Sequence, residues 1–150
     1  MDLILWRHAE AEEGTPDLAR ELTGRGRKQA ARMADWLTPR LPPDVRILAS
    51  PATRTRQTVK ALGRDYDIDE RLVPGAQPDA VLAAAGWPDA VRPVLIVGHQ
   101  PTLGRVAARL LSGRDGDVSV KKAGVWWFQC RWRDDELQIV LRAVAGPDYA

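Results

Sequence analysis

Val94-Leu95-Ile96-Val97-Gly98-His99 is the most informative stretch of this sequence. Its continuous apolar run, rich in β-branched residues, is typical of a strand buried on both faces of a sheet. Leu3-Ile4-Leu5-Trp6 is a second run of this kind, and Val45–Ala49 is a further predicted strand. Helical patterns separate the three. Strands that alternate with helices predict a mainly parallel sheet covered by helices on both faces.

The helices are expected where apolar residues recur at helical spacing. Thr23 is placed to cap the first helix, which ends before Pro39. Ser50-Pro51 opens the next one, with proline at the first helical position. A short Ala-rich helix is expected over about 78–86, after a weaker extended stretch over about 67–73. The apolar stripes of the other helices are Ala30, Met33, Ala34 and Leu37; Thr55, Thr58, Val59 and Leu62; and Leu103, Val106, Ala107, Leu110 and Leu111.

The C-terminal third changes to the alternating pattern of β-strands. Trp126, Phe128, Cys130 and Trp132 alternate, Asp134-Asp135 turns the chain, and Leu137, Ile139 and Leu141 alternate back. This pattern predicts an antiparallel hairpin whose aromatic face is buried and whose cysteine is an inert thiol. Trp127 points the other way, to cover a helix or to lie at a contact surface. The fold expected is a three-layer α/β/α domain spanning 1–150, with the hairpin at one edge.

The composition limits the classes of protein to consider. The chain has 150 residues, 45% hydrophobic and 28% charged, which is ordinary for a globular domain. No apolar run approaches the roughly 18–20 residues that span a bilayer, and the first residues lack the basic start of a signal peptide. A cytoplasmic location without membrane contact is therefore expected. One cysteine excludes an internal disulfide, and two histidines argue against a zinc site. No metal or other cofactor is expected.

The charge pattern favours no nucleic-acid partner. Lys and Arg number 22 against 20 Asp and Glu, so the net charge is only +2. Arginine supplies 18 of these cations. This excess fits a GC-rich genome and also fits phosphate binding, and composition does not decide between the two. Three cations lie near the start of the first helix, where positive charge is unfavourable: Arg25, Arg27 and Lys28. They form either a solvated face or a basic rim that attracts an acidic partner.

Polar residues follow three of the predicted strands. Arg7-His8 comes at the end of the strand over 3–6, and Ser50-Pro51 follows the strand over 45–49, with Arg54 four residues after Ser50. His99 comes after the central strand over 94–97. In open α/β sheets, ligands bind beyond the carboxyl ends of the strands. Arg54 would lie at a helix N-terminus, where free N–H groups favour an anion. One histidine after a strand is more often structural, but two with arginine partners indicate a phosphate site.

These residue types suit phosphoryl transfer. A neutral imidazole can attack phosphorus, and neighbouring arginines disfavour its protonation and stabilise the charge on the phosphoryl oxygens. Arg7-His8, directly after a predicted strand, resembles the Arg-His-Gly signature of the histidine phosphatase (phosphoglycerate mutase-like) superfamily. Three further segments resemble its motifs, in the family's order: Leu22-Thr23 with Gly26, Gln29 and Ala30; Ser50-Pro51-x-x-Arg54-x-x-Gln57-Thr58; and Val97-Gly98-His99.

The resemblance implies a role for each matching residue. His8 would be the phosphorylated nucleophile, Arg7 and Arg54 would clamp the phosphoryl group, and His99 would complete the pocket. The backbone N–H of Gln100 is a further expected donor. The sequence departs from the family at Ala9, where glycine is usual. It departs again at the family's proton-donating acid, which has no obvious match in this sequence. Glu70 lies in the corresponding segment, either as this acid or as a solvated carboxylate of a loop.

The short chain resembles the bacterial SixA-type phosphohistidine phosphatases within this superfamily. A phosphoramidate depends less on an enzymic acid than an ester does, because its nitrogen leaves readily once protonated. The expected substrate is therefore a phosphohistidine-bearing signalling protein, such as a histidine phosphotransfer domain. The alternatives are a small phosphate ester as substrate, or a phosphate-binding module without turnover. The oligomeric state is not determined by the sequence.

Overall fold

The computed structural model describes residues 1–150 and contains a six-stranded sheet with the strand order β3-β2-β4-β1-β5-β6. Strands β1 to β4 run parallel, and β5 and β6 form the antiparallel edge. The strands are β1 (Asp2–Arg7), β2 (Arg46–Ala49), β3 (Asp67–Ile68), β4 (Val94–Gly98), β5 (Val125–Arg133) and β6 (Glu136–Ala145). The central run Val94–Gly98 lies between β2 and β1, as its complete burial requires.

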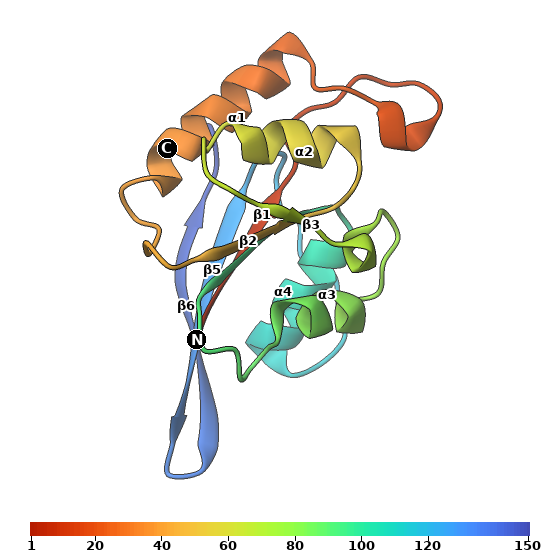
Figure 1. Ribbon diagram of the computed structural model, residues 1–150. Coiled ribbons are helices and arrows are strands. Elements are labelled where there is room, and N and C mark those ends of the chain that lie inside the picture. Colours follow the sequence, from red (N-terminus) through yellow and green to blue (C-terminus); the bar gives the residue numbers. More distant parts are fainter.

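Helices cover both faces of this sheet, which confirms the three-layer α/β/α fold (Figure 1). One apolar cluster joins the sheet to α1 (Gly24–Leu37) and α2 (Thr53–Lys60). The other joins it to α3 (Pro78–Ala85) and α4 (Thr102–Ser112). Two 3-10 turns, η1 (Asp17–Ala19) and η2 (Glu70–Leu72), lie in the connections. None of these helices has the length and apolar character needed to cross a membrane.

The helix boundaries agree with the sequence patterns except in α2 and at one position of α4. Thr23 caps α1, accepting the Gly26 N–H at 2.9 Å. The expected start of α2 was wrong, because Pro51 lies outside a helix that begins at Thr53 after Ala52. Leu111 was also wrongly placed on the buried face of α4, and its side chain is 48% exposed. The expected extended stretch over 67–73 is two residues of β3 followed by η2.

The C-terminal hairpin is as expected, but not all of its aromatic face is buried. Phe128 and Cys130 are buried, Trp126 is half-buried, and Trp127 is buried against the opposite cluster. Trp132 was wrongly placed in the core, since it is 59% exposed. The turn end of the hairpin extends beyond the helical layers (Figure 1).

Candidate active site

The carboxyl ends of three parallel strands place the candidate residues at one edge of the sheet. His8 follows β1, Ser50 follows β2 and His99 follows β4, and these strands are direct neighbours. The strand pairing continues past the strand ends, because the His8 N–H donates to the Gly98 carbonyl at 3.1 Å. The two imidazole rings lie with centroids 5.3 Å apart. The structure therefore brings together both histidines of the chain.

The tautomer of His8 follows from its hydrogen bond. Its Nδ1 lies 2.7 Å from the Ala9 carbonyl oxygen, which can only accept, so Nδ1 carries the proton. This leaves the lone pair of the neutral ring on Nε2. The pKa of His8 is lowered to about 4, and burial is the largest cause. The hydrogen bond to Ala9 opposes this shift, whereas the charges of Arg54, Arg7 and Arg20 contribute to it. The ring is thus a free base at neutral pH.

His99 is held by the segment that follows β2. Its Nε2 lies 2.8 Å from Ser50 Oγ, and Ser50 Oγ also accepts the Ala52 N–H at 3.2 Å. The other ring nitrogen, Nδ1, is buried and has no hydrogen-bond partner within the protein. Burial lowers the pKa of His99 to about 3, and the nearby His8 and Arg54 also lower it.

Two arginines direct positive charge at this edge. Arg7 donates from Nη1 to the Val120 carbonyl at 2.9 Å, and burial lowers its pKa. Arg54 lies in the first turn of α2, with only 5% of its side chain exposed. The Nε atoms of both guanidiniums are buried without a partner. Two desolvated cations with unused donors are suited to an anion with several oxygens, such as a phosphoryl group.

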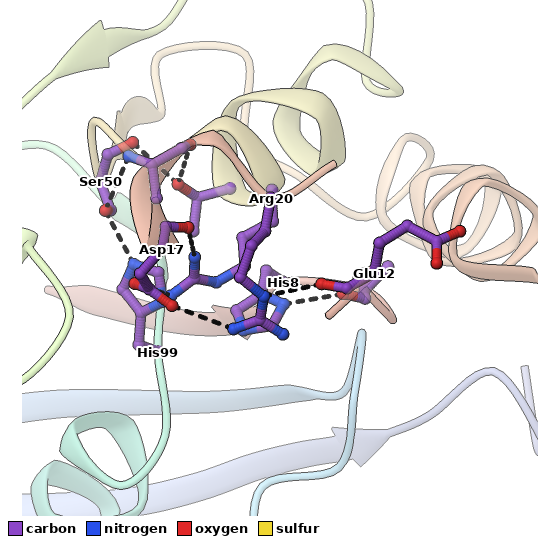
Figure 2. A network of polar contacts seen from close by, with 10 residues as sticks. His8, Glu12, Asp17, Arg20, Ser50 and His99 are labelled. Carbon is purple, nitrogen blue, oxygen red and sulfur yellow. Dashed lines mark hydrogen bonds and ion pairs between the residues drawn. The ribbon is translucent and has the colours of Figure 1, made fainter. Parts of the chain in front are cut away.

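Asp17 and Arg20 complete this polar cluster, and neither is predicted from the sequence. Asp17 accepts from Arg54 Nη1 through its backbone carbonyl at 2.8 Å and from Nη2 through its carboxylate at 3.1 Å. Arg20 donates to the same carboxylate at 3.1 Å and, through Nε, to the Glu12 carbonyl at 2.7 Å. Figure 2 shows Asp17 and Arg20 gathered with His8 and His99. Both lie in the polar loop between β1 and α1, which carries no apolar pattern to indicate its path.

The geometry of Asp17 leaves part of Arg54 available. Asp17 contacts the two terminal nitrogens of the guanidinium, so the edge formed by Nε remains unpaired. Hydrogen bonding from Arg20 lowers the pKa of Asp17, as does Arg54. An ionised Asp17 therefore orients Arg54 from one side while the Nε edge can receive a phosphoryl oxygen.

The remaining motif residues build the loops that carry the site. Thr58 Oγ1 accepts the Ala9 N–H at 3.0 Å, and Gln57 Oε1 accepts the Leu22 N–H at 2.8 Å. Gln29 Oε1 accepts the Glu10 N–H at 3.0 Å. Gly26 is required for close packing, because a Cβ there would lie 2.0 Å from the Glu10 carbonyl oxygen. These residues hold the segment after His8 against α1 and α2.

The two remaining candidates, Glu70 and Gln100, have no contact in the structure that assigns them a role in the site. Glu70 follows β3 at the same edge of the sheet, but it is exposed. The side chain of Gln100 bridges the Val118 carbonyl and the Gly104 N–H, at 3.0 and 2.6 Å. The proton-donor role of Glu70 and the donor role of the Gln100 backbone stay predictions.

Comparison with known proteins agrees with this arrangement. The family model of the histidine phosphatase superfamily (branch 1) matches residues 3–75. A phosphohistidine phosphatase SixA homolog from Haemophilus influenzae is 29% identical over 99% of both chains. An uncharacterized protein from Mycobacterium tuberculosis is 38% identical over 120 residues, 75% of each chain. The solved structure of the protein histidine phosphatase SixA complexed with tungstate has the same fold, with a TM-score of 0.78 at 23% identity over 99% of this chain and 98% of that one.

The fold and the paired histidines define a histidine phosphatase domain, and this chain belongs to the histidine phosphatase superfamily. Within that superfamily it is similar to the SixA proteins, and it matches the homolog from Haemophilus influenzae along nearly its whole length.

Proposed function

We propose that this protein is a metal-independent phosphatase that forms a phosphohistidine intermediate on His8 and acts on phosphohistidine in a signalling protein. One observation carries this proposal. The buried side-chain nitrogens without a hydrogen-bond partner are Arg7 Nε, Arg54 Nε and His99 Nδ1. All three belong to one site beside His8. Unpaired buried polar groups are rare and costly, so their gathering supports a polyoxygen anion as the natural ligand.

The proposed reaction has two steps. His8 Nε2 attacks the phosphorus, so that the Nε2–P bond forms and the N–P bond of the substrate breaks, and the departing imidazole nitrogen takes a proton from solvent. Water then attacks the phosphorus of phosphorylated His8. The new O–P bond forms as the Nε2–P bond breaks, inorganic phosphate leaves, a proton of the attacking water returns to solvent, and His8 is again a neutral imidazole. Arg7 and Arg54 stabilise the charge on the phosphoryl oxygens in both steps, and His99 completes the pocket.

The choice of substrate rests on the chemistry of the leaving group and on the relatives. An alkoxide needs a proton from a positioned acid, whereas a phosphoramidate nitrogen leaves readily once it is protonated. The one candidate acid, Glu70, is exposed. The Haemophilus influenzae and Escherichia coli relatives are both named for phosphohistidine phosphatase. These points favour phosphohistidine over a small phosphate ester.

The test is phosphate release from a protein phosphorylated on histidine, measured beside an aryl phosphate and an alkyl phosphate. We expect rapid release from phosphohistidine and a loss of more than about a thousandfold in His8→Ala, as for removal of other enzymic nucleophiles. Release that survives in His8→Ala would overturn the role of His8. Binding of phosphate without turnover of any substrate would instead support a phosphate-binding module.

The same assay separates the two substrate classes through Glu70→Gln. If Glu70 is not the proton donor, the Glu70→Gln variant keeps the wild-type rate on phosphohistidine, and its rate on the alkyl phosphate is not lowered relative to the wild type. A loss of about a hundredfold or more on the alkyl phosphate, with efficient wild-type turnover of that ester, would assign Glu70 as the acid and small esters as substrates.

A further inference from the structure

A second positively charged feature lies beside the phosphoryl site. A groove of about 530 Å³ is lined by Arg7, Arg25, Lys121 and Lys122, together with Gln29 and Asp148. We name it the basic groove. Its lining comes from the end of β1, the first half of α1, the segment before β5 and the C-terminal residues. Segments far apart in the sequence therefore converge on it.

The basic groove adjoins His8 through direct backbone contacts. Ala123, next to Lys122, donates its N–H to the His8 carbonyl at 3.1 Å. Gln29, one turn after Arg25 in α1, accepts the Glu10 N–H at 3.0 Å. Arg7 itself lines the groove. Arg7 is therefore shared by the groove and the phosphoryl site, and the segments that carry the groove's other cations contact the residues around His8.

The charge of the basic groove is poorly balanced. Arg25 and Lys121 are exposed and belong to no ion pair, and Lys122 has only a long contact, 3.9 Å, with Glu10. Asp148 is the one carboxylate in the lining. The position of Arg25 is also unfavourable for the helix, because α1 has no acidic residue in its first turn and a cation there opposes the helix dipole. The surplus of positive charge is suited to an anionic group.

We propose that the basic groove binds an acidic side chain that flanks the phosphohistidine of the protein substrate. This inference rests on the proposed function, and it names the feature by which the enzyme selects among phosphohistidine proteins. The groove has the volume of a site for a small organic ligand, so it has room for an Asp or Glu side chain with its backbone. The acidic side chain would pair with Arg25 and Lys121, while the phosphoryl group lies against Arg7, Arg54 and His8.

The experiment compares two phosphohistidine peptides of equal length, one with Asp and Glu beside the histidine and one with Asn and Gln there. We expect wild-type kcat/KM to favour the acidic peptide by about threefold to tenfold, as for two partly exposed ion pairs. The double variant Arg25→Gln/Lys121→Gln should lose this preference and keep its rate on the neutral peptide. The matched control is Arg131→Gln/Arg133→Gln, which removes the same charge from exposed positions on the distant part of the hairpin.

Each outcome decides the proposal. A preference that disappears only in the groove variant supports it. Equal rates on both peptides in the wild type, a preference that persists in the groove variant, or an equal loss in the control would overturn it. If neither peptide is hydrolysed, the substrate class of the proposed function fails. The groove is then tested by inhibition of aryl phosphate turnover with the unphosphorylated peptides. The acidic peptide must inhibit the wild type more strongly than the neutral peptide does, and this difference must be absent in the groove variant.

Discussion

At the scale of single residues, the proposed chemistry depends on keeping the imidazoles of His8 and His99 neutral inside a cationic site. The sequence predicts that the neighbouring arginines keep His8 neutral. In the structure, burial is the largest cause for both His8 and His99, and the arginines add to it. Burial therefore keeps His8 a free base at neutral pH, as the proposed nucleophile must be, and the same burial makes its protonation in acid unfavourable for the folded state.

The stability of the protein should consequently depend on pH through His8. The unfolded state binds a proton at His8 as the pH falls below 6.5, whereas the folded state does so only near 4. The unfolded state binds more protons over this interval, so the free energy of unfolding falls as the pH falls. The loss attributable to His8 is about 2 to 3 kcal/mol on going from about pH 7 to about pH 4.5. Urea unfolding at the two pH values measures it.

The control for this prediction is His8→Asn, which cannot titrate in this range. Its free energy of unfolding should fall less than that of the wild type, by the part due to His8. An equal fall in both proteins would mean that His8 titrates alike in the folded and unfolded states.

At the scale of elements, glycines allow α1 and α4 to approach the loops of the site. Gly104 lies in the first turn of α4, where a Cβ would be 1.8 Å from the Val118 carbonyl oxygen and 2.8 Å from Gln100 Nε2. Gln100 itself joins Val118 to α4 through its side-chain amide. The contact fixes the start of α4, directly after His99, against the segment that leads to the basic groove.

Gly104→Ala should therefore destabilise the protein, although alanine is the better helix former. Helix propensity alone predicts a gain of about 1 kcal/mol. The close backbone contact outweighs it, and we expect a net loss of about 1 to 3 kcal/mol in urea unfolding. Gly116→Ala is the matched control, since its Cβ would meet Ala108 at an ordinary 3.5 Å. A stabilised Gly104→Ala variant would show that the Val118 segment yields without cost.

At the scale of the whole molecule, the two helical layers decide which parts of the sheet are core. Phe128 is fully buried between β5 and the layer formed by α3 and α4. Trp132 follows on the same strand at the same alternation, near the turn of the hairpin, and is 59% exposed. The turn end of the hairpin extends past the helical layers (Figure 1). Phe128 and Trp132 share one alternating pattern, but they are expected to contribute different amounts to the free energy of unfolding.

Alanine substitution should separate these two aromatic residues clearly. Phe128→Ala removes a fully buried ring and should lower the free energy of unfolding by about 3 to 5 kcal/mol. Trp132→Ala should change it by less than about 1 kcal/mol, because little of its environment is lost. Chemical denaturation of both variants measures the difference. Similar losses would mean that the end of the hairpin is covered in solution.

The local sequence determined the strands, most helix boundaries and the placement of both histidines. A buried parallel strand needs a continuous apolar run, and a helix needs a cap and a 3.6-residue stripe, so these features are written in adjacent residues. The common edge of His8, Arg54 and His99 follows, because parallel strands share the direction of their carboxyl ends. The motif residues Gln29, Gln57 and Thr58 were recognisable, although their hydrogen bonds were not.

The tertiary structure alone decided the rest. Asp17 meets Arg54 across 37 positions of sequence, and no local pattern encodes that contact. The exposure of Trp132 depends on how far along the hairpin the helical layers extend. The basic groove depends on four separate segments meeting beside Arg7. The physical reason is that hydrophobic periodicity records only whether a side chain is turned toward the core, whereas pairing, coverage and shared clefts depend on which distant segments the packing brings together.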